Sequence, residues 1–98
     1  MYRVVYHKLV LKEDIIKIPK KDLEQIFKAI EKKLFKDPLN FGKPLRKELK
    51  GYYKLRIGRY RAVYRIQDDK VIVYILKIGL RKDLQVYLDA AKRLRLFE

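Results

Sequence analysis

Residues 49–67 read LKGYYKLRIGRYRAVYRIQ and largely alternate apolar or aromatic residues with basic ones at strand spacing. The stretch holds six cations, four tyrosines and no acidic residue. Successive side chains of a strand point to opposite faces of a sheet, so this pattern separates an apolar face from a basic face. Gly58-Arg59 suits a two-residue hairpin turn. The stretch therefore predicts a β-hairpin, with strands at about 52–57 and 60–67.

The two-residue turn sets the register of this hairpin. Ile57 then opposes Tyr60, Arg56 opposes Arg61, and so on to Tyr53 opposite Tyr64. The apolar face collects Tyr53, Leu55, Ile57, Tyr60, Ala62, Tyr64 and Ile66, which we expect to pack on two N-terminal helices. The basic face collects Lys54, Arg56, Arg61 and Arg65. Like charges directly opposite each other on two strands destabilise a sheet. Unfavourable local arrangements of this kind are common at functional sites. The alternative is that these side chains splay into solvent.

The rest of the chain predicts helices and strands around the hairpin. Tyr2–Tyr6 reads as a strand, and Leu11, Ile15 and Ile18 mark a short helix that Pro19 ends. A second helix follows, with the apolar stripe Leu23, Ile26, Phe27, Ile30 and Leu34. We expect a loop at 37–44, a turn at Asp68-Asp69, a strand at 70–77, and a last helix with Leu84, Tyr87, Leu88, Ala91 and Leu94 at helical spacing. This predicts a single α+β domain over residues 1–98, of order β-α-α-β-β-β-α. Its sheet is mainly antiparallel, with two N-terminal helices on one face and a C-terminal helix.

The amino-acid composition limits the partners and the catalytic groups that the chain can have. The 98 residues carry a net charge of +14, which favours nucleic acid, an anionic membrane surface or an acidic protein as partner. The chain has no Ser, Thr or Cys, so the usual hydroxyl and thiol nucleophiles are missing. His7 is the single histidine, so no multi-histidine metal site or histidine acid/base pair forms within one chain, and we expect it to be structural or exposed rather than catalytic. No signal peptide or membrane-length apolar run is present, so we expect a cytoplasmic protein with no membrane partner.

A basic sheet face interleaved with tyrosines suits RNA. Cleavage of RNA by its own 2′-hydroxyl builds charge on a phosphorane, which fixed guanidinium groups stabilise. A lysine crowded by cations has its neutral form favoured, which brings it toward the role of general base. Such a reaction calls for no metal and no cofactor.

The chain resembles the RelE/ParE toxin superfamily. The resemblance covers nearly the whole chain and rests on Leu49-Lys50-Gly51, the Gly58–Tyr64 stretch (GRYRAVY), and Gly79-Leu80-Arg81 followed by Val86-Tyr87. RelE-type members of this superfamily are mRNA endonucleases that act in the ribosomal A site and are held inactive by an antitoxin. ParE-type members share the fold but inhibit DNA gyrase.

The resemblance implies a role for each basic residue. Lys54 would help to activate the 2′-hydroxyl, Arg61 would stabilise the phosphorane, and Arg81 would assist the leaving 5′-oxygen. Tyr87 would stack on a base, and Lys50 would contact RNA. The remaining site residues are expected to be Arg56, in the catalytic set, and Arg59 and Arg65, as RNA-binding residues. Arg56 departs from the pattern, because RelE has a lysine there, and which residue is the base stays open.

The resemblance also implies partners: an acidic antitoxin, the ribosome with its mRNA, and promoter DNA through the toxin–antitoxin complex alone. Leu94, Leu96 and Phe97 are expected to contribute to the antitoxin contact or to cap the core. Two other functions stay open. One is a gyrase inhibitor that cleaves no RNA, and the other is a catalytically silent RNA- or DNA-binding domain.

Overall fold

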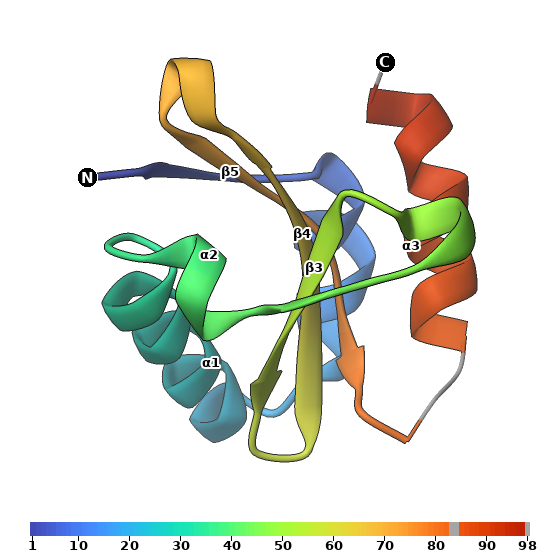
Figure 1. Ribbon diagram of the computed structural model, residues 1–98. Helices are drawn as coiled ribbons and strands as arrows, with labels where there is room; N and C mark the ends of the chain where they lie inside the picture. Colours follow the sequence, from blue (N-terminus) through green and yellow to red (C-terminus); the bar gives the residue numbers. More distant parts are fainter. Residues whose placement is uncertain (83–84, 98) are drawn as a thin grey trace.

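The computed structural model describes residues 1–82 and 85–97, without the side chains of Glu48 and of residues 94–97. Its strands are β1 (Arg3–Tyr6), β2 (Lys43–Pro44), β3 (Tyr52–Ile57), β4 (Tyr60–Gln67) and β5 (Ile72–Leu80), and its helices are α1 (Lys20–Lys33), α2 (Pro38–Phe41) and α3 (Gln85–Phe97). The strands form one sheet of order β1-β5-β4-β3-β2, in which β1 runs parallel to β5 and the other pairs are antiparallel. Helices α1 and α3 lie on opposite faces of this sheet (Figure 1). The predicted α+β fold is thereby confirmed.

The hairpin has the predicted register. Arg56 pairs with Arg61, and Tyr53 pairs with Tyr64. Gly58 occupies the turn with φ of 58°, a left-handed conformation that glycine adopts without the steric cost of a Cβ. The register thus follows from the turn, and it places Lys54, Arg56, Arg61 and Arg65 on one face of the sheet, as expected.

The main core lies between the apolar face of the sheet and α1. Ile26, Ile30 and Leu34 of the predicted helical stripe pack there against the hairpin. Tyr64 is fully buried in this core, and its hydroxyl donates a hydrogen bond of 2.6 Å to the carbonyl oxygen of Pro38. Burial raises the pKa of Tyr64, so this hydroxyl stays protonated and able to donate. The bond ties α2 to the centre of the sheet.

The N-terminal helical segment differs from its prediction. It consists of a π-helical turn at Val10–Asp14 followed by a 3₁₀ turn at Ile15–Lys17. The wider π turn changes which residues share a face. As a result Val10 and Asp14 are buried, whereas Leu11, expected in the apolar stripe, is 49% exposed.

Two predicted loops also contain more structure than expected. Residues 37–44 form α2 and the short edge strand β2, which pairs with β3. The turn at Asp68-Asp69 is a 3₁₀ turn over Asp68–Lys70 that ends at Val71 with φ of 54°. Strand β5 therefore begins later than predicted and extends to Leu80.

Helix α3 covers the other face of the sheet through a small second core. Val86 and Ala90 pack there against Val63 and Leu76. The predicted apolar stripe is wrong at Leu88, which is 57% exposed, because the buried face of the helix instead includes Arg93. Leu84, Leu94, Leu96 and Phe97 lie outside the described side chains. None of the helices described here is long and apolar enough to cross a membrane.

Candidate nucleic-acid interface

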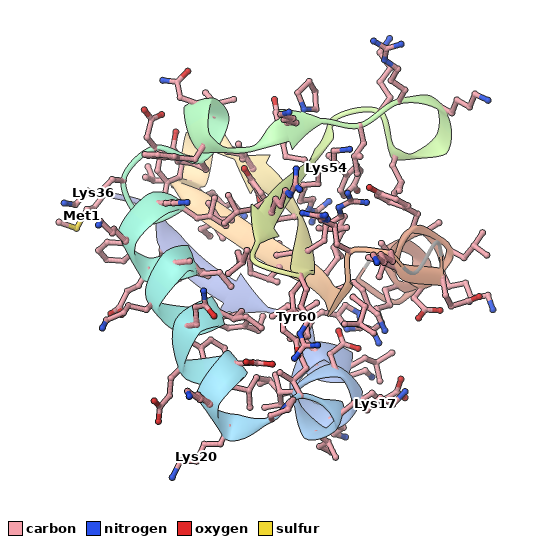
Figure 2. All side chains as sticks on the ribbon, turned by 90° about the horizontal axis from the view of Figure 1, so that it is seen from below. Met1, Lys17, Lys20, Lys36, Lys54 and Tyr60 are labelled. Atoms are coloured by element: carbon pink, nitrogen blue, oxygen red, sulfur yellow. The ribbon has the colours of Figure 1, made fainter. Side chains whose placement is uncertain are left out.

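The basic face occupies the part of the hairpin that α3 leaves uncovered. Lys54 and Arg56 come from β3, and Arg61 and Arg65 come from β4. Arg56 is exposed, and the other three are partly buried. Figure 2 shows Lys54 between the hairpin and the segment that precedes β3, in a region crowded with side-chain nitrogens. The face therefore presents several cations to one point on the surface.

Arg61 connects this face to α3. Its Nη1 donates a hydrogen bond to the hydroxyl of Tyr87, and its guanidinium carbon lies 5.1 Å from the centroid of the Tyr87 ring. The Nε of Arg61 is buried and has no hydrogen-bond partner among the described residues. A buried donor without a partner is energetically costly.

Lys54 lies where three grooves meet. One, of about 170 Å³, runs past Arg56 and Arg61 to Phe41, and a second, of about 340 Å³, connects Lys54 to Tyr87. A third, of about 600 Å³, leads from Lys54 to Lys50. Lys54 lines all three grooves, and each of them has further basic side chains in its lining. The cations lining this third groove are Lys43, Arg46, Lys47, Lys50 and Lys54.

Arg59 and Arg81 lie at the turn end of the hairpin. The backbone N–H of Arg81 donates a hydrogen bond of 2.7 Å to the carbonyl oxygen of Arg59, which continues the β4–β5 ladder past Leu80. The two arginines line a separate pocket of about 300 Å³ together with Lys82. The structure thus brings Lys54, Arg56, Arg61 and Tyr87 together and places Arg81 beside Arg59. Arg65 lies elsewhere on the basic face, with its guanidinium carbon 4.8 Å from the centroid of the Tyr74 ring.

His7 is part of the fold's interior, as expected for a structural histidine. It is 4% exposed, and its Nδ1 accepts a hydrogen bond of 3.0 Å from the backbone N–H of Leu9. Burial, together with the nearby charges of Arg93 and Lys8, lowers the pKa of the imidazole below its usual 6.5. His7 is therefore neutral at pH 7 and lies apart from the basic face.

Sequence reasoning missed a buried ionic network between α3 and the rest of the chain. Its members are Asp14, Lys77, Asp89 and Arg93. Burial opposes ionisation of Asp89, but hydrogen bonds from Gln85 and Lys77 outweigh it and lower the pKa of this carboxyl. One signal was present in the sequence: Lys77 interrupts the apolar run of β5, IVYILKIGL, and a buried lysine requires a partner.

Comparison with known proteins identifies the family. Residues 4–85 match the family described as the ParE toxin of the type II toxin–antitoxin system parDE. The chain belongs to this toxin family. It is a RelE-like toxin of a type II toxin–antitoxin system, as the resemblance implied.

Named relatives of the toxin are RelE proteins. The toxin is 38% identical over 73 residues to toxin RelG of Mycobacterium tuberculosis, an alignment that covers 74% of this chain and 84% of RelG. It is 44% identical over 41 residues to the mRNA interferase toxin RelE of Escherichia coli, covering 42% of this chain and 43% of RelE.

Solved structures of relatives share the fold of the toxin. The toxin–antitoxin complex RelBE2 of M. tuberculosis matches with a TM-score of 0.77 and 36% identity, over 84% of this chain and 93% of that one. A mutant of E. coli RelE in the free state matches with a TM-score of 0.75 and 27% identity, over 95% and 97% of the two chains. The intact E. coli RelBE complex matches with a TM-score of 0.69 and 26% identity, over 85% and 100%.

Proposed function

We propose that this toxin is a ribosome-dependent endoribonuclease that cleaves mRNA in the A site through metal-independent attack by a 2′-hydroxyl. The observation that carries the proposal is the contact between Arg61 and Tyr87 beside Lys54, at the junction of basic grooves. The E. coli relative named an mRNA interferase supports the same reaction. The other residues of the proposed catalytic set are Arg56 and Arg81.

The proposed reaction assigns a task to each group. Lys54 removes the proton of the 2′-hydroxyl, whose oxygen attacks the adjacent phosphorus. The P–O5′ bond then breaks and the leaving 5′-oxygen takes up a proton from water, so that the products are a 2′,3′-cyclic phosphate and a 5′-hydroxyl. Arg61 stabilises the phosphorane through its guanidinium group. Arg81 stabilises the leaving oxygen, and the partly exposed ring of Tyr87 stacks on a base.

The positive charges of the basic face favour the binding of an anion, independently of any cleavage reaction. Arg56 and Arg61 are directly opposed across the hairpin, an arrangement that costs energy while the site is empty. A phosphate between the two guanidinium groups would relieve the repulsion through charge-assisted hydrogen bonds. Lys50, Arg59 and Arg65 extend the proposed RNA contact beyond the scissile bond.

The test adds purified toxin to ribosomes programmed with a defined mRNA and a vacant A site, with RNA ends mapped by primer extension. We expect cleavage within the A-site codon, a 2′,3′-cyclic phosphate end and no cleavage of free mRNA. Arg61→Ala and Arg81→Ala should each lower the cleavage rate by about 10²–10³-fold, the usual cost of removing a donor to a developing oxyanion. Arg3→Ala, which removes an exposed arginine from β1 at the far edge of the sheet, is the matched control. A folded Arg61→Ala/Arg81→Ala double variant with full activity would sink the proposal.

The proposed partner that restrains this activity is an acidic antitoxin. The net charge of +14 favours an acidic chain, and relatives of this toxin have been solved as complexes with RelB antitoxins. Antitoxin that covers the basic face would block cleavage in the assay above. The rate at which it associates with the toxin would fall as the salt concentration rises. Promoter DNA would be bound through the toxin–antitoxin complex alone, and a ribosomal target places the toxin's action in the cytoplasm.

A second candidate is inhibition of DNA gyrase, because the matching family is described by its ParE members. A supercoiling assay with purified gyrase separates the two functions. Inhibited supercoiling together with intact ribosome-bound mRNA would favour the ParE-like activity. If neither activity is present, salt-sensitive RNA binding would identify a catalytically silent binding domain.

A further inference from the structure

We infer that the buried ionic network of Asp14, Lys77, Asp89 and Arg93 positions Tyr87 against Arg61, which makes these four side chains positioning residues for the RNA site. The inference rests on the proposed function for its catalytic readout. Its structural content, that the network fixes the placement of α3, stands independently of that function.

Asp14 is the centre of the network. Its Oδ1 accepts hydrogen bonds from Lys77 Nζ at 2.8 Å and from Arg93 Nη2 at 2.9 Å. Its Oδ2 accepts bonds from Arg93 Nη1 at 2.6 Å and from the backbone N–H of Ile78 at 2.9 Å. The Asp14 side chain is 1% exposed and that of Arg93 is 4% exposed. A bidentate pair of this kind fixes orientation as well as distance.

The network holds α3 at two successive turns. Arg93 also donates a bond of 2.9 Å to the carbonyl oxygen of Leu76 on β5, and Asp89 lies 2.9 Å from Lys77 Nζ. Asp89 and Arg93 are four residues apart and so share one face of the helix. Asp89 and Arg93 therefore attach this face of α3 to β5 and to the N-terminal helical segment. Together they set the rotation of the helix about its axis and its position along that axis.

Among the side chains of α3 that the structure describes, apolar packing specifies this position weakly. Those fully buried in the second core are the small Val86 and Ala90, and Tyr87 packs against them while partly exposed. Small apolar contacts tolerate sliding and rotation, whereas charged groups shielded from water require their partners in place. Tyr87 follows Val86 directly and faces Arg61, so a shift of the helix moves its ring relative to the basic face.

The experiment measures single-turnover cleavage at saturating toxin, in the ribosome assay, for Arg93→Met, Tyr87→Ala and the double variant. A positioning role predicts that Arg93→Met lowers the rate constant about tenfold or more, and that the double variant falls no more than about twofold below Tyr87→Ala, because coupled residues are not additive. Glu13→Gln is the matched control. Glu13 is an exposed acid 3.4 Å from Arg93, and its removal should leave the rate unchanged. Losses that multiply in the double variant would overturn the positioning role.

An NMR measurement on the labelled full chain reports on the same geometry without RNA. Contacts between the Tyr87 ring and the Arg61 side chain should be present in the native toxin and in Glu13→Gln, and should be lost in Arg93→Met. Should Arg93→Met fail to fold, Asp89→Asn is the second variant, since it leaves the Asp14–Arg93 pair in place. It should weaken the contacts and lower the rate to a smaller extent. Unchanged contacts and rate in the folded network variants would overturn the inference, whereas absence of cleavage by the native toxin would overturn the proposed function alone.

Discussion

Replacing Gly79 by alanine should displace α3 and impair the RNA site while leaving the sheet intact. A Cβ at this position would lie 2.7 Å from Cγ2 of Val86, against an ordinary contact distance of at least 3.4 Å. Val86 is fully buried and, as a β-branched residue in a helix, has essentially one rotamer available. The overlap is therefore relieved by moving α3 away from β5 by about 0.7 Å.

This displacement has two measurable consequences. Overpacking of this kind costs about 1–3 kcal/mol of unfolding free energy, which urea denaturation would measure. Because Tyr87 moves with Val86, and misplacement by about 1 Å can cost about 10²-fold in rate, cleavage should fall by roughly 10–10²-fold. Adding Val86→Ala removes the clashing methyl group, so the double variant should recover part of the lost activity. A Gly79→Ala variant with native stability and native activity would refute the reasoning.

Three further predictions concern stability and binding. Asp14→Asn should lower the unfolding free energy by about 3–5 kcal/mol, because it removes the buried carboxylate that Lys77 and Arg93 share and leaves them only the more exposed Asp89 and Glu13, whereas Glu13→Gln should change it by less than about 0.5 kcal/mol in the same urea titration. The folded-state pKa of His7 lies below the unfolded value of 6.5, so the unfolded chain binds the extra proton. Stability is thus full above about pH 6.5 and falls as the pH drops below it, and His7→Asn should flatten this dependence in denaturation curves at pH 7.5 and 5.5. Arg65→Ala should weaken RNA binding uniformly across sequences and reduce the slope of log K against log salt by about 1, and an unchanged slope would remove Arg65 from the interface.

The hairpin shows what local sequence can predict. Its register depends on a two-residue turn at Gly58-Arg59 and on strict alternation, and both are readable from neighbouring residues. The apolar stripe of α1 is local in the same way, since Ile26 and Ile30 differ by one helical turn. One of the motifs that carry the family resemblance, the Gly58–Tyr64 stretch, lies in this hairpin.

The rest of the site depends on contacts that no local pattern contains. Strand β2 has two residues, Lys43 and Pro44, so it offers no alternation to detect, and its pairing with β3 makes it a strand. The π-helical turn changes the helical phase, which placed Leu11 wrongly on the buried face. No local pattern connects Arg93 to its partner, Asp14, because the two are 79 residues apart in the sequence.

Because Asp14 and Arg93 are far apart in the sequence, the parts of the toxin that they join are synthesised at different times. The chain is made from the N-terminus, and β3, β4 and β5 all precede α3. A nascent chain can therefore form the basic hairpin while Tyr87 and Arg93 are still inside the ribosome. At that stage Asp14 has no arginine to pair with, Lys77 lacks Asp89, and Arg61 has no tyrosine beside it. The basic face would thus form before the proposed catalytic arrangement, which is complete only once α3 has emerged.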